Sequence, residues 1–330
     1  MKQYLTPKWL LSTAGIIVLL LWILSIFWSV EPDTFEPYAI ANKHATENQQ
    51  QLVAGYTITT SLIVVSETLL NKSGGYLSND VIPPSVMMDN MPSWEFGALE
   101  MVRDLALSMR KDFSRSQSQS LENPFLTKAQ PQFNNDSLSW ILPSAESKYQ
   151  EGIDNLYNYR DTLADSSQQQ GQFYARADNL RDWLKQVEKR LGSLSQRLSA
   201  SVGQERLDTN LAGDAEALQS TPTANKLTEK TNWWLLDNNF YEARGASWAL
   251  LHFLKGVEVD FADVLEKKNA RVSLQQIIRE LEATQEALWS PMVLNGSGFG
   301  MLANHSLVMA NYISRANAAL IELSELLNQG

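Results

Sequence analysis

An uninterrupted apolar run close to the N-terminus constrains this chain more than any other feature. From Trp9 to Val30 the sequence contains no charged residue. A helix of about 20 apolar residues is long enough to cross the hydrocarbon core of a bilayer. The run therefore predicts a single membrane-spanning helix, with the lipid bilayer as the partner of residues 9–30.

The charges on either side of the run predict its direction. Two basic residues precede it and three acidic residues follow it, namely Lys2, Lys8, Glu31, Asp33 and Glu36. Basic flanks stay on the cytoplasmic side of a membrane. We therefore expect residues 1–30 to form a cytoplasmic tail and anchor, and residues 31–330 to form one domain outside the cytoplasm.

A cleaved signal peptide is the alternative interpretation of the run. The tripeptide Ala39-Ile40-Ala41 has the small-residue pattern of a cleavage site. However, the apolar run exceeds the roughly 7–15 residues of a signal-peptide core, and this tripeptide lies far beyond its end. The sequence therefore favours a retained anchor.

A second apolar stretch, from Leu52 to Leu70, contains Glu67 and many Ser and Thr residues. Such a segment is too polar to lie in lipid. It predicts an amphipathic helix within residues 31–330, called here the body.

Composition excludes some classes of partner and chemistry. The 330 residues carry a net charge of −10, which argues against a nucleic-acid partner because phosphate binding needs a basic surface. The chain contains no cysteine, so disulfides and thiolate sites are absent.

Helical periodicity recurs along the body, whereas strand signals are scarce. Two segments have apolar residues at alternating spacings of four and three, a pattern called here a seam. The clearest seam runs from Phe173 to Leu198 within a predicted helix at 172–200, and a second one runs from Met309 to Leu327. Further helices are predicted at Trp94–Phe113, Tyr149–Leu163, Tyr241–Lys268 and Leu274–Leu288. The expected fold is all-α: an N-terminal transmembrane helix followed by a long-helix bundle.

Some details of the bundle stay open. Ser273 and Gln276 have the spacing of a capping box for the helix that ends before Pro291. The segment 202–231 is poor in large apolar residues and is expected to be a mobile loop, which can join two lobes. The seams favour packing within the chain, although the same seams can form a homo-oligomer.

Several runs of the body resemble a known family. These are the segments that begin WEFGALEMVRDLALSMRKDF at Trp94, FYARADNLRDWLKQVEKRL at Phe173, FYEARGASWALLHFLKGVEVDF at Phe240 and LWSPMVLNGSGFGMLANHSL at Leu288. They are similar to DUF2333, a family of proteobacterial envelope proteins without an assigned activity. The resemblance implies residence in the bacterial inner membrane, which makes the outer side the periplasm, and it transfers no catalytic residue.

Candidate chemical groups are few. None of the three histidines, His44, His252 and His305, lies in a metal-binding or di-iron motif, so we expect no metal site and no cofactor. The acids Glu258, Asp260, Asp263 and Glu266 are expected to form a solvated, salt-bridged helix face. The pairs Glu242 with Arg244, and Glu100 with Arg103 and Asp104, can lie between helices or on the surface.

One glycine-rich run precedes the last helix, which is predicted to start near Met301. Its glycines, Gly296, Gly298 and Gly300, lie just before His305, which the seam places on the apolar face one turn inside that helix. A tight connector and a satisfied core histidine are the simpler interpretation. The alternative is a small anion or polar ligand held at the helix N-terminus.

The sequence therefore favours a non-catalytic accessory or scaffold protein of the bacterial envelope, with protein partners of unknown identity. An enzyme or ligand sensor with a pocket near residues 295–300 and His305 is the alternative.

Overall fold

The structure is a computed structural model that describes residues 7–116, 121–165, 167–168, 171–207, 226–290, 292–297 and 300–329. These residues form the predicted all-α fold, with one two-stranded ribbon. In the ribbon, β1 (Gln204–Leu207) pairs antiparallel with β2 (Lys226–Glu229). Most of the segment expected to be a mobile loop, residues 208–225, lies outside the described residues.

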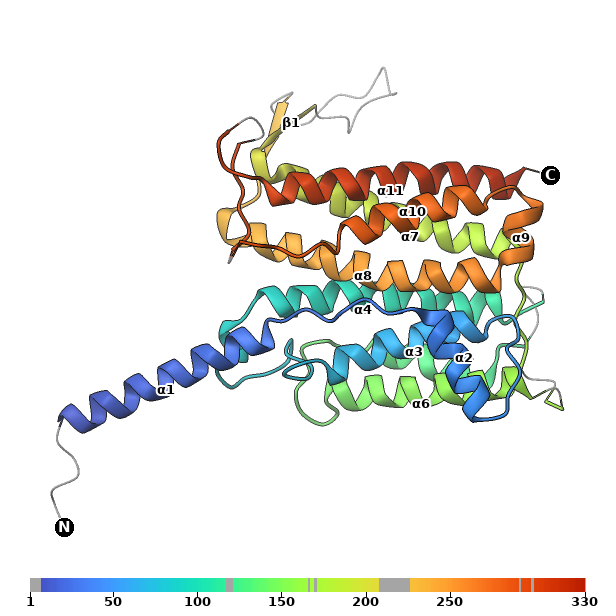
Figure 1. Cartoon of the computed structure of the whole chain (residues 1–330), viewed down its shortest axis with the longest axis horizontal. Coiled ribbons are helices and arrows are strands. Elements are labelled where there is room, and N and C mark those ends of the chain that lie inside the picture. The colour runs from blue at the N-terminus through green and yellow to red at the C-terminus, as the bar shows by residue number, and fades with distance from the viewer. Residues whose placement is uncertain are drawn as a thin grey trace, which may run out of the picture.

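The first helix, α1 (Pro7–Trp28), projects from one end of the body (Figure 1). Within it, Trp9–Trp28 has a mean hydropathy of 2.6 and is long and apolar enough to cross a membrane. Trp28, at its end, packs on the body: a Cβ placed on Gly74 would lie 2.7 Å from Cγ of Trp28. The apolar helix is therefore exposed along its length and anchored at its last turn.

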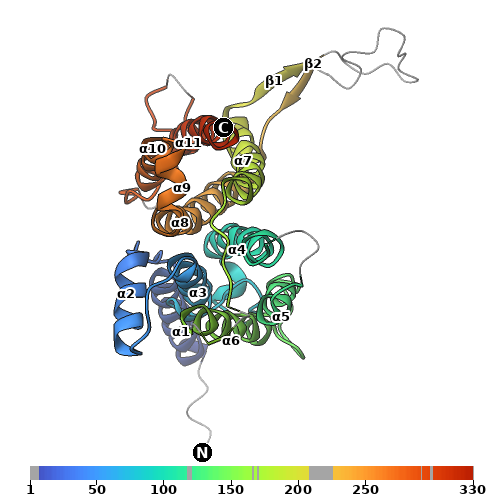
Figure 2. The ribbon, with the colours of Figure 1, turned by 90° about the vertical axis from the view of Figure 1, so that its right-hand side faces the viewer.

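The body consists of two groups of helices that lie side by side (Figures 1 and 2). The first group contains α2 (Pro37–Glu47), α3 (Tyr56–Asn71), α4 (Asn90–Ser108, continued by a π-turn at Met109–Phe113), α5 (Pro124–Phe133) and α6 (Ala145–Ala164). The second contains α7 (Ala177–Ser199), α8 (Leu236–Asp260), α9 (Ala262–Lys267), α10 (Arg271–Ala283) and α11 (His305–Asn328). Three 3-10 turns complete the elements, at Ser85–Met87, Ala200–Val202 and Trp233–Leu235.

The two groups share one continuous hydrophobic core, which passes between α4 and α8. The buried rings of Trp94 and Trp248 meet there with centroids 5.1 Å apart. At the other end of the same contact, Phe113 meets Phe261 at 5.3 Å. The body is therefore one packed unit.

The predicted seams are buried within the chain. The seam leucines of α7, including Leu184 and Leu191, are fully buried, and so are Ile313 and Leu320 of α11. The two helices pack against each other, and Oγ of Ser195 donates to the carbonyl of Ala310 on α11. The partner of each seam is thus another helix of the same chain.

Helix α3 is amphipathic only in its second half, where Val64, Glu67, Thr68 and Asn71 form a partly exposed stripe, whereas every residue from Tyr56 to Ile63 is buried. Its hydroxyl groups are satisfied inside the helix: Thr59, Thr60 and Ser61 each donate to the carbonyl four residues earlier, at 2.6–2.9 Å. Buried hydroxyls cost little free energy when they are hydrogen-bonded in this way.

Several helix boundaries also differ from the prediction. Helix α7 begins at Ala177, so Phe173 lies before it, and the helix predicted at Tyr241–Lys268 is divided into α8 and α9. Helix α10 begins at Arg271, so Ser273 lies inside it and forms no capping box. The same helix ends at Ala283, before Leu288. Helix α11 begins at His305 and not near Met301, because the side chain of Asn304 caps it by accepting a hydrogen bond from the Leu307 N–H at 2.9 Å.

Candidate functional site

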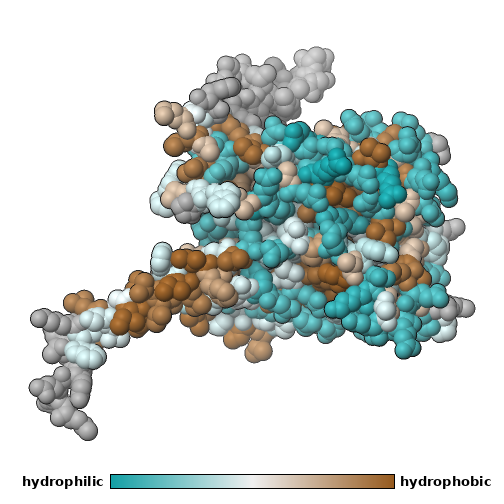
Figure 3. Space-filling view, in the orientation of Figure 1, coloured by the Kyte–Doolittle hydropathy of each residue, from teal (hydrophilic) through white to brown (hydrophobic). Residues whose placement is uncertain are grey.

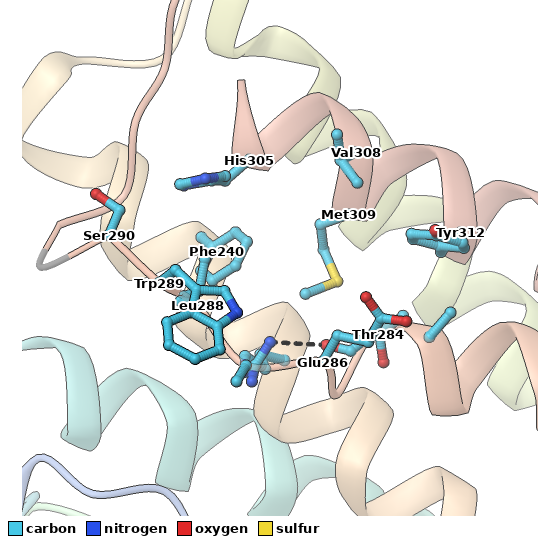
Figure 4. Close-up of a pocket in the computed structure, with 13 residues that line it drawn as sticks. Phe240, Thr284, Glu286, Leu288, Trp289, Ser290, His305, Val308, Met309 and Tyr312 are labelled. Atoms are coloured by element: carbon cyan, nitrogen blue, oxygen red, sulfur yellow. Dashed lines mark hydrogen bonds between the residues drawn. The ribbon is translucent and has the colours of Figure 1, made fainter. Parts of the chain in front are cut away.

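A pocket of about 380 Å³ lies between α8, the end of α10 and the first turns of α11. Figure 4 shows its lining, which is mostly apolar and aromatic: Phe240, Leu288, Trp289, Val308, Met309 and Tyr312 are among the side chains. Small-molecule sites are usually concave and apolar with a few polar groups. This pocket, called here the α8–α11 pocket, has the character of such a site.

Arg244 lines the α8–α11 pocket, but its donors are already engaged. Its Nε donates to Glu31 at 2.5 Å, and its two terminal nitrogens donate to the carbonyls of Thr284 and Gln285 at 2.9 and 3.3 Å. A guanidinium used in this way ties three segments together. It is a structural cation rather than a free anion-binding group.

His305 lies beside the α8–α11 pocket as the first residue of α11. Its Nδ1 accepts a hydrogen bond from the Leu294 N–H at 3.0 Å, and its own N–H donates to the Leu294 carbonyl at 2.8 Å. Burial lowers the pKa of His305 below its usual value. The ring is therefore neutral at pH 7 with its proton on Nε2, for which no described residue supplies a partner.

The glycine-rich run forms a pinned connector in front of α11. Asn295 and Asn304 form an antiparallel bridge, and the Gly296 N–H donates to the Ala303 carbonyl at 3.0 Å. A Cβ on Gly296 would lie 2.5 Å from the carbonyl oxygen of Leu302, so the close approach of the two backbones requires glycine. Gly300 lies in the same connector, whereas Gly298 is outside the described residues.

Because α11 begins at His305, the candidate site differs from the predicted one. The N–H groups of His305 and Leu307 at the helix N-terminus already have acceptors, the Leu294 carbonyl and the Asn304 side chain. His305 is thus not one turn inside the helix, and it is half-buried rather than in the core. A ligand at this place would meet the α8–α11 pocket beside His305 instead of the glycines.

Sequence reasoning missed the segment that follows α1. Residues 31–36, called here the strap, lie along one face of α8 and contact it at four successive turns. Glu31 pairs with Arg244, the Asp33 carbonyl accepts from Trp248 Nε1 at 3.2 Å, the Phe35 N–H donates to His252 Nε2 at 2.9 Å, and Glu36 pairs with Lys255 at 2.7 Å. The partners are more than 210 residues apart in sequence, so periodicity gives no sign of them.

His252 is the centre of this contact. It is fully buried, its ring stacks on Phe35 with centroids 3.8 Å apart, and its Nδ1–H donates to the Trp248 carbonyl at 2.7 Å. Burial, the largest cause, lowers its pKa to about 3. His252 is therefore a neutral structural histidine with both ring nitrogens used.

One member of the predicted acidic face, Asp260, is half-buried and caps another helix instead of forming a surface salt bridge. Asp260 Oδ2 accepts a hydrogen bond from the Ile58 N–H at 2.7 Å and so caps the N-terminus of α3 from the end of α8. Burial raises the pKa of Asp260 to about 7 against the opposing effect of these hydrogen bonds. The others follow the prediction better, since Glu258 pairs with Arg271 at 3.5 Å, and Asp263 and Glu266 are exposed.

The remaining charged candidates lie between helices. Arg190 of α7 bridges Glu100 and Asp104 of α4 at 2.5 and 2.7 Å, and Arg197 pairs with Glu242 of α8 at 2.5 Å. Arg103 pairs with Glu100 on its own helix. These pairs align α7 with α4 and α8.

Sequence reasoning also missed a buried cation in the first group of helices. The Arg160 guanidinium lies over the rings of Tyr56 and Tyr157 and donates to His44 Nε2 at 2.7 Å. Burial lowers the pKa of His44, with Arg160 as the next cause. This cluster joins α2, α3 and α6.

A search of the described residues for groups of three or more His, Asp or Glu side chains that could hold a metal ion finds none. Comparison with known families gives one match: the model of an uncharacterised protein conserved in bacteria, DUF2333, covers residues 3–330. No curated protein and no solved structure matches the chain.

Proposed function

The chain belongs to the DUF2333 family, and on that premise we propose that it is a non-catalytic accessory or scaffold protein of the bacterial envelope. In this proposal α1 spans the inner membrane with its N-terminus in the cytoplasm. The helical body stands in the periplasm and presents its surface to protein partners.

The observation that carries the proposal is the strap. Four successive contacts hold residues 31–36 against α8, and Trp28 is seated on Gly74. A flexible tether would let the body move freely relative to α1. A fixed exit from the membrane suits a protein that must present its surface to membrane neighbours at a set height and orientation.

The strap also supports a retained anchor. Cleavage after Ala41 would remove residues 31–36, leaving Arg244 without Glu31 and exposing the ring of His252 to solvent. It would also cut within α2, whose Ala41 is fully buried. Intact mass of the chain extracted from membranes should include α1, and a mass that begins after residue 41 would contradict the anchor.

The orientation is tested with reporter fusions in a bacterium. Reporters placed after Leu70 and after Gly330 should both be active only in the periplasm, because the acidic flank follows α1. A cytoplasmic signal at both positions would reverse the topology.

The scaffold role is tested by purification from gently solubilised membranes at native abundance. We expect stoichiometric protein partners. A chain that purifies alone as a monomer would contradict the role. The variant Glu31→Gln, which loosens the strap, should bind the same partners less well. Glu36→Gln is the control and should bind them as the wild type does, because Glu36 is largely exposed.

A second candidate function, a ligand sensor or enzyme, rests on the α8–α11 pocket beside His305. Val308 lines this pocket and is 54% exposed, so Val308→Trp would fill it without disturbing the core. A small molecule that copurifies with the wild type and with Val308→Ala, but not with Val308→Trp, would support this function. Its absence from all three would contradict it.

A further inference from the structure

Several loops gather at the end of the body from which α1 leaves. Helices α4, α6, α8 and α11 all begin at this end, so the segments before them lie there too (Figure 1). These segments, called here the anchor-side loops, are the described parts of residues 72–89, 134–144, 230–235 and 284–304. The first two are in contact, because Asn79 Nδ2 donates to the Ser139 carbonyl at 2.8 Å.

Each anchor-side loop exposes large apolar side chains. Six of the most prominent are Ile82, Met87, Trp140, Leu142, Trp234 and Trp289. At the opposite end, the described residues of segments 48–55, 114–123, 165–176 and 261–272 include two large apolar residues that are exposed, Leu121 and Val272. Figure 3 shows hydrophobic surface along α1 and on parts of the body beside it. Large apolar side chains that are exposed together at one end of a molecule are typical of a contact with another apolar body.

We propose that the anchor-side loops rest in the interface of the same bilayer that α1 spans, so that the body lies on the membrane instead of standing clear of it. The bilayer is the proposed partner of these loops because α1, which would span it, leaves the body at the same end. The last turn of α1 is held to the loop at 72–89 by Trp28 on Gly74, and the strap fixes the next residues. Any membrane around α1 therefore faces this end of the body.

The residue types fit the same occupant. Tryptophan is enriched where membrane and water meet, and loop-borne aliphatic side chains bind the boundary between headgroups and acyl chains. The loops carry the exposed acids Asp80, Asp136 and Glu286 against one exposed cation among their described residues, Lys230, while Lys72 is buried in an ion pair with Glu95. Attraction to anionic lipid is thus not the cause of the contact, and apolar insertion is.

The cysteine-free chain allows a direct test. Single variants Trp140→Cys and Trp289→Cys place a thiol on two anchor-side loops, and Val272→Cys places one at the opposite end, where Val272 is 75% exposed. Each full-length variant is labelled with an environment-sensitive fluorophore and reconstituted into vesicles of phosphatidylcholine that contain a lipid with a spin-label quencher near the headgroup.

We expect the labels at positions 140 and 289 to be quenched at least several-fold more than the label at position 272. In the vesicles, the labels at 140 and 289 should also emit at a shorter wavelength than the same fluorophore free in buffer. Equal quenching at all three positions, or quenching only after anionic lipid is added, would overturn the proposal. If the anchor-side loops bind a protein partner instead of lipid, the labels at 140 and 289 should show little quenching in these vesicles, which contain no partner. That result would overturn the proposal as well.

A second measurement removes the apolar contact without touching the core. The triple variant Ile82→Ser, Trp140→Ser and Trp234→Ser should melt like the wild type, because all three side chains are exposed. With the label at position 289, it should lose most of the quenching, whereas unchanged quenching would contradict insertion. Neither measurement depends on which side of the membrane the body occupies, so the result is independent of the proposed scaffold role.

Discussion

Gly97 of α4 and Gly245 of α8 each lie against the backbone of the other helix. A Cβ on Gly97 would lie 1.9 Å from the carbonyl oxygen of Glu242, and a Cβ on Gly245 would lie 2.0 Å from that of Trp94. Two backbones come this close only where side chains are missing. This reciprocal contact brings the backbones of the two groups of helices into direct contact.

Gly97→Ala should therefore destabilise the protein by about 2–3 kcal/mol or more, because the added methyl group would overlap backbone atoms that cannot rotate away. Thermal unfolding of the full chain in detergent, followed by circular dichroism, measures the effect. Gly192→Ala in α7 is the matched control: its Cβ would lie 3.6 Å from the nearest atom, and helix propensity predicts a gain of about 0.5–1 kcal/mol. Equal melting temperatures of the two variants would contradict the close contact between the backbones of α4 and α8.

The strap predicts unequal effects for its two acidic residues. Glu31→Gln should cost about 2–4 kcal/mol, because it leaves the buried guanidinium of Arg244 without its carboxylate. Glu36→Gln should cost less than about 1 kcal/mol, because Glu36 is 69% exposed and Lys255 also pairs with Glu282. Melting temperatures and protease cleavage between α1 and α2 report the difference, and cleavage at the same rate in both variants would argue against a bound strap.

His252 predicts a dependence of stability on pH. Its pKa is lowered to about 3 in the folded protein, so the unfolded chain binds the extra proton more readily below pH 6.5. This stability is complete above about pH 7 and is lost as the pH falls toward 3. Between pH 7 and 5.5 the loss should be about 1 kcal/mol, measured by denaturant unfolding at the two pH values.

The control for this prediction is the variant His252→Gln, whose stability should change less between pH 7 and 5.5 than that of the wild type. Asp260 acts in the opposite direction. Because its pKa is raised to about 7, its contribution is complete below pH 3.8 and is lost as the pH rises through 7. Asp260→Asn should thus steepen the loss on acidification, and identical pH profiles in the three proteins would contradict both assignments.

The seam of α7 predicts the largest single loss. Leu184 is fully buried, so Leu184→Asp would place an unpaired carboxylate in the core and should unfold the body, whose whole stability is expected to be about 5–15 kcal/mol. Lys185→Asp, one residue along on the exposed face, should change stability by less than about 1 kcal/mol. Wild-type melting of Leu184→Asp would show that the seam does not pack in the core.

Local sequence patterns predicted most of the fold because packing repeats along a helix. The seam from Leu180 to Leu198 recurs every three or four residues, and that spacing alone gives the helix and its buried face. The start of α11 did not follow from such a pattern. It depends on the pairing of Asn304 with Gly296 and on the hydrogen bonds between Leu294 and His305, which form only after the connector folds back.

The structural roles of Asp260 and His252 were beyond sequence reasoning for a related reason. In the sequence, Asp260 is one of four acids on a predicted helix face. Its hydrogen-bond partner, the Ile58 N–H, is 202 residues away. The partner of His252, Phe35, is 217 residues away. A contact between distant segments leaves no periodicity in either of them, and a single sequence has no other record of it.

In the topology proposed above, in which the body lies outside the cytoplasm, the polar side chains of α3 have a second role. In the folded body its hydroxyls hide their polarity one turn back along their own helix, as Thr59 does with Gly55. In that topology the segment would cross the membrane before it packs, and its Ser, Thr and Glu67 side chains would disfavour lateral release into lipid. The same side chains that cost the folded core little free energy would thus keep α3 from acting as a stop-transfer sequence.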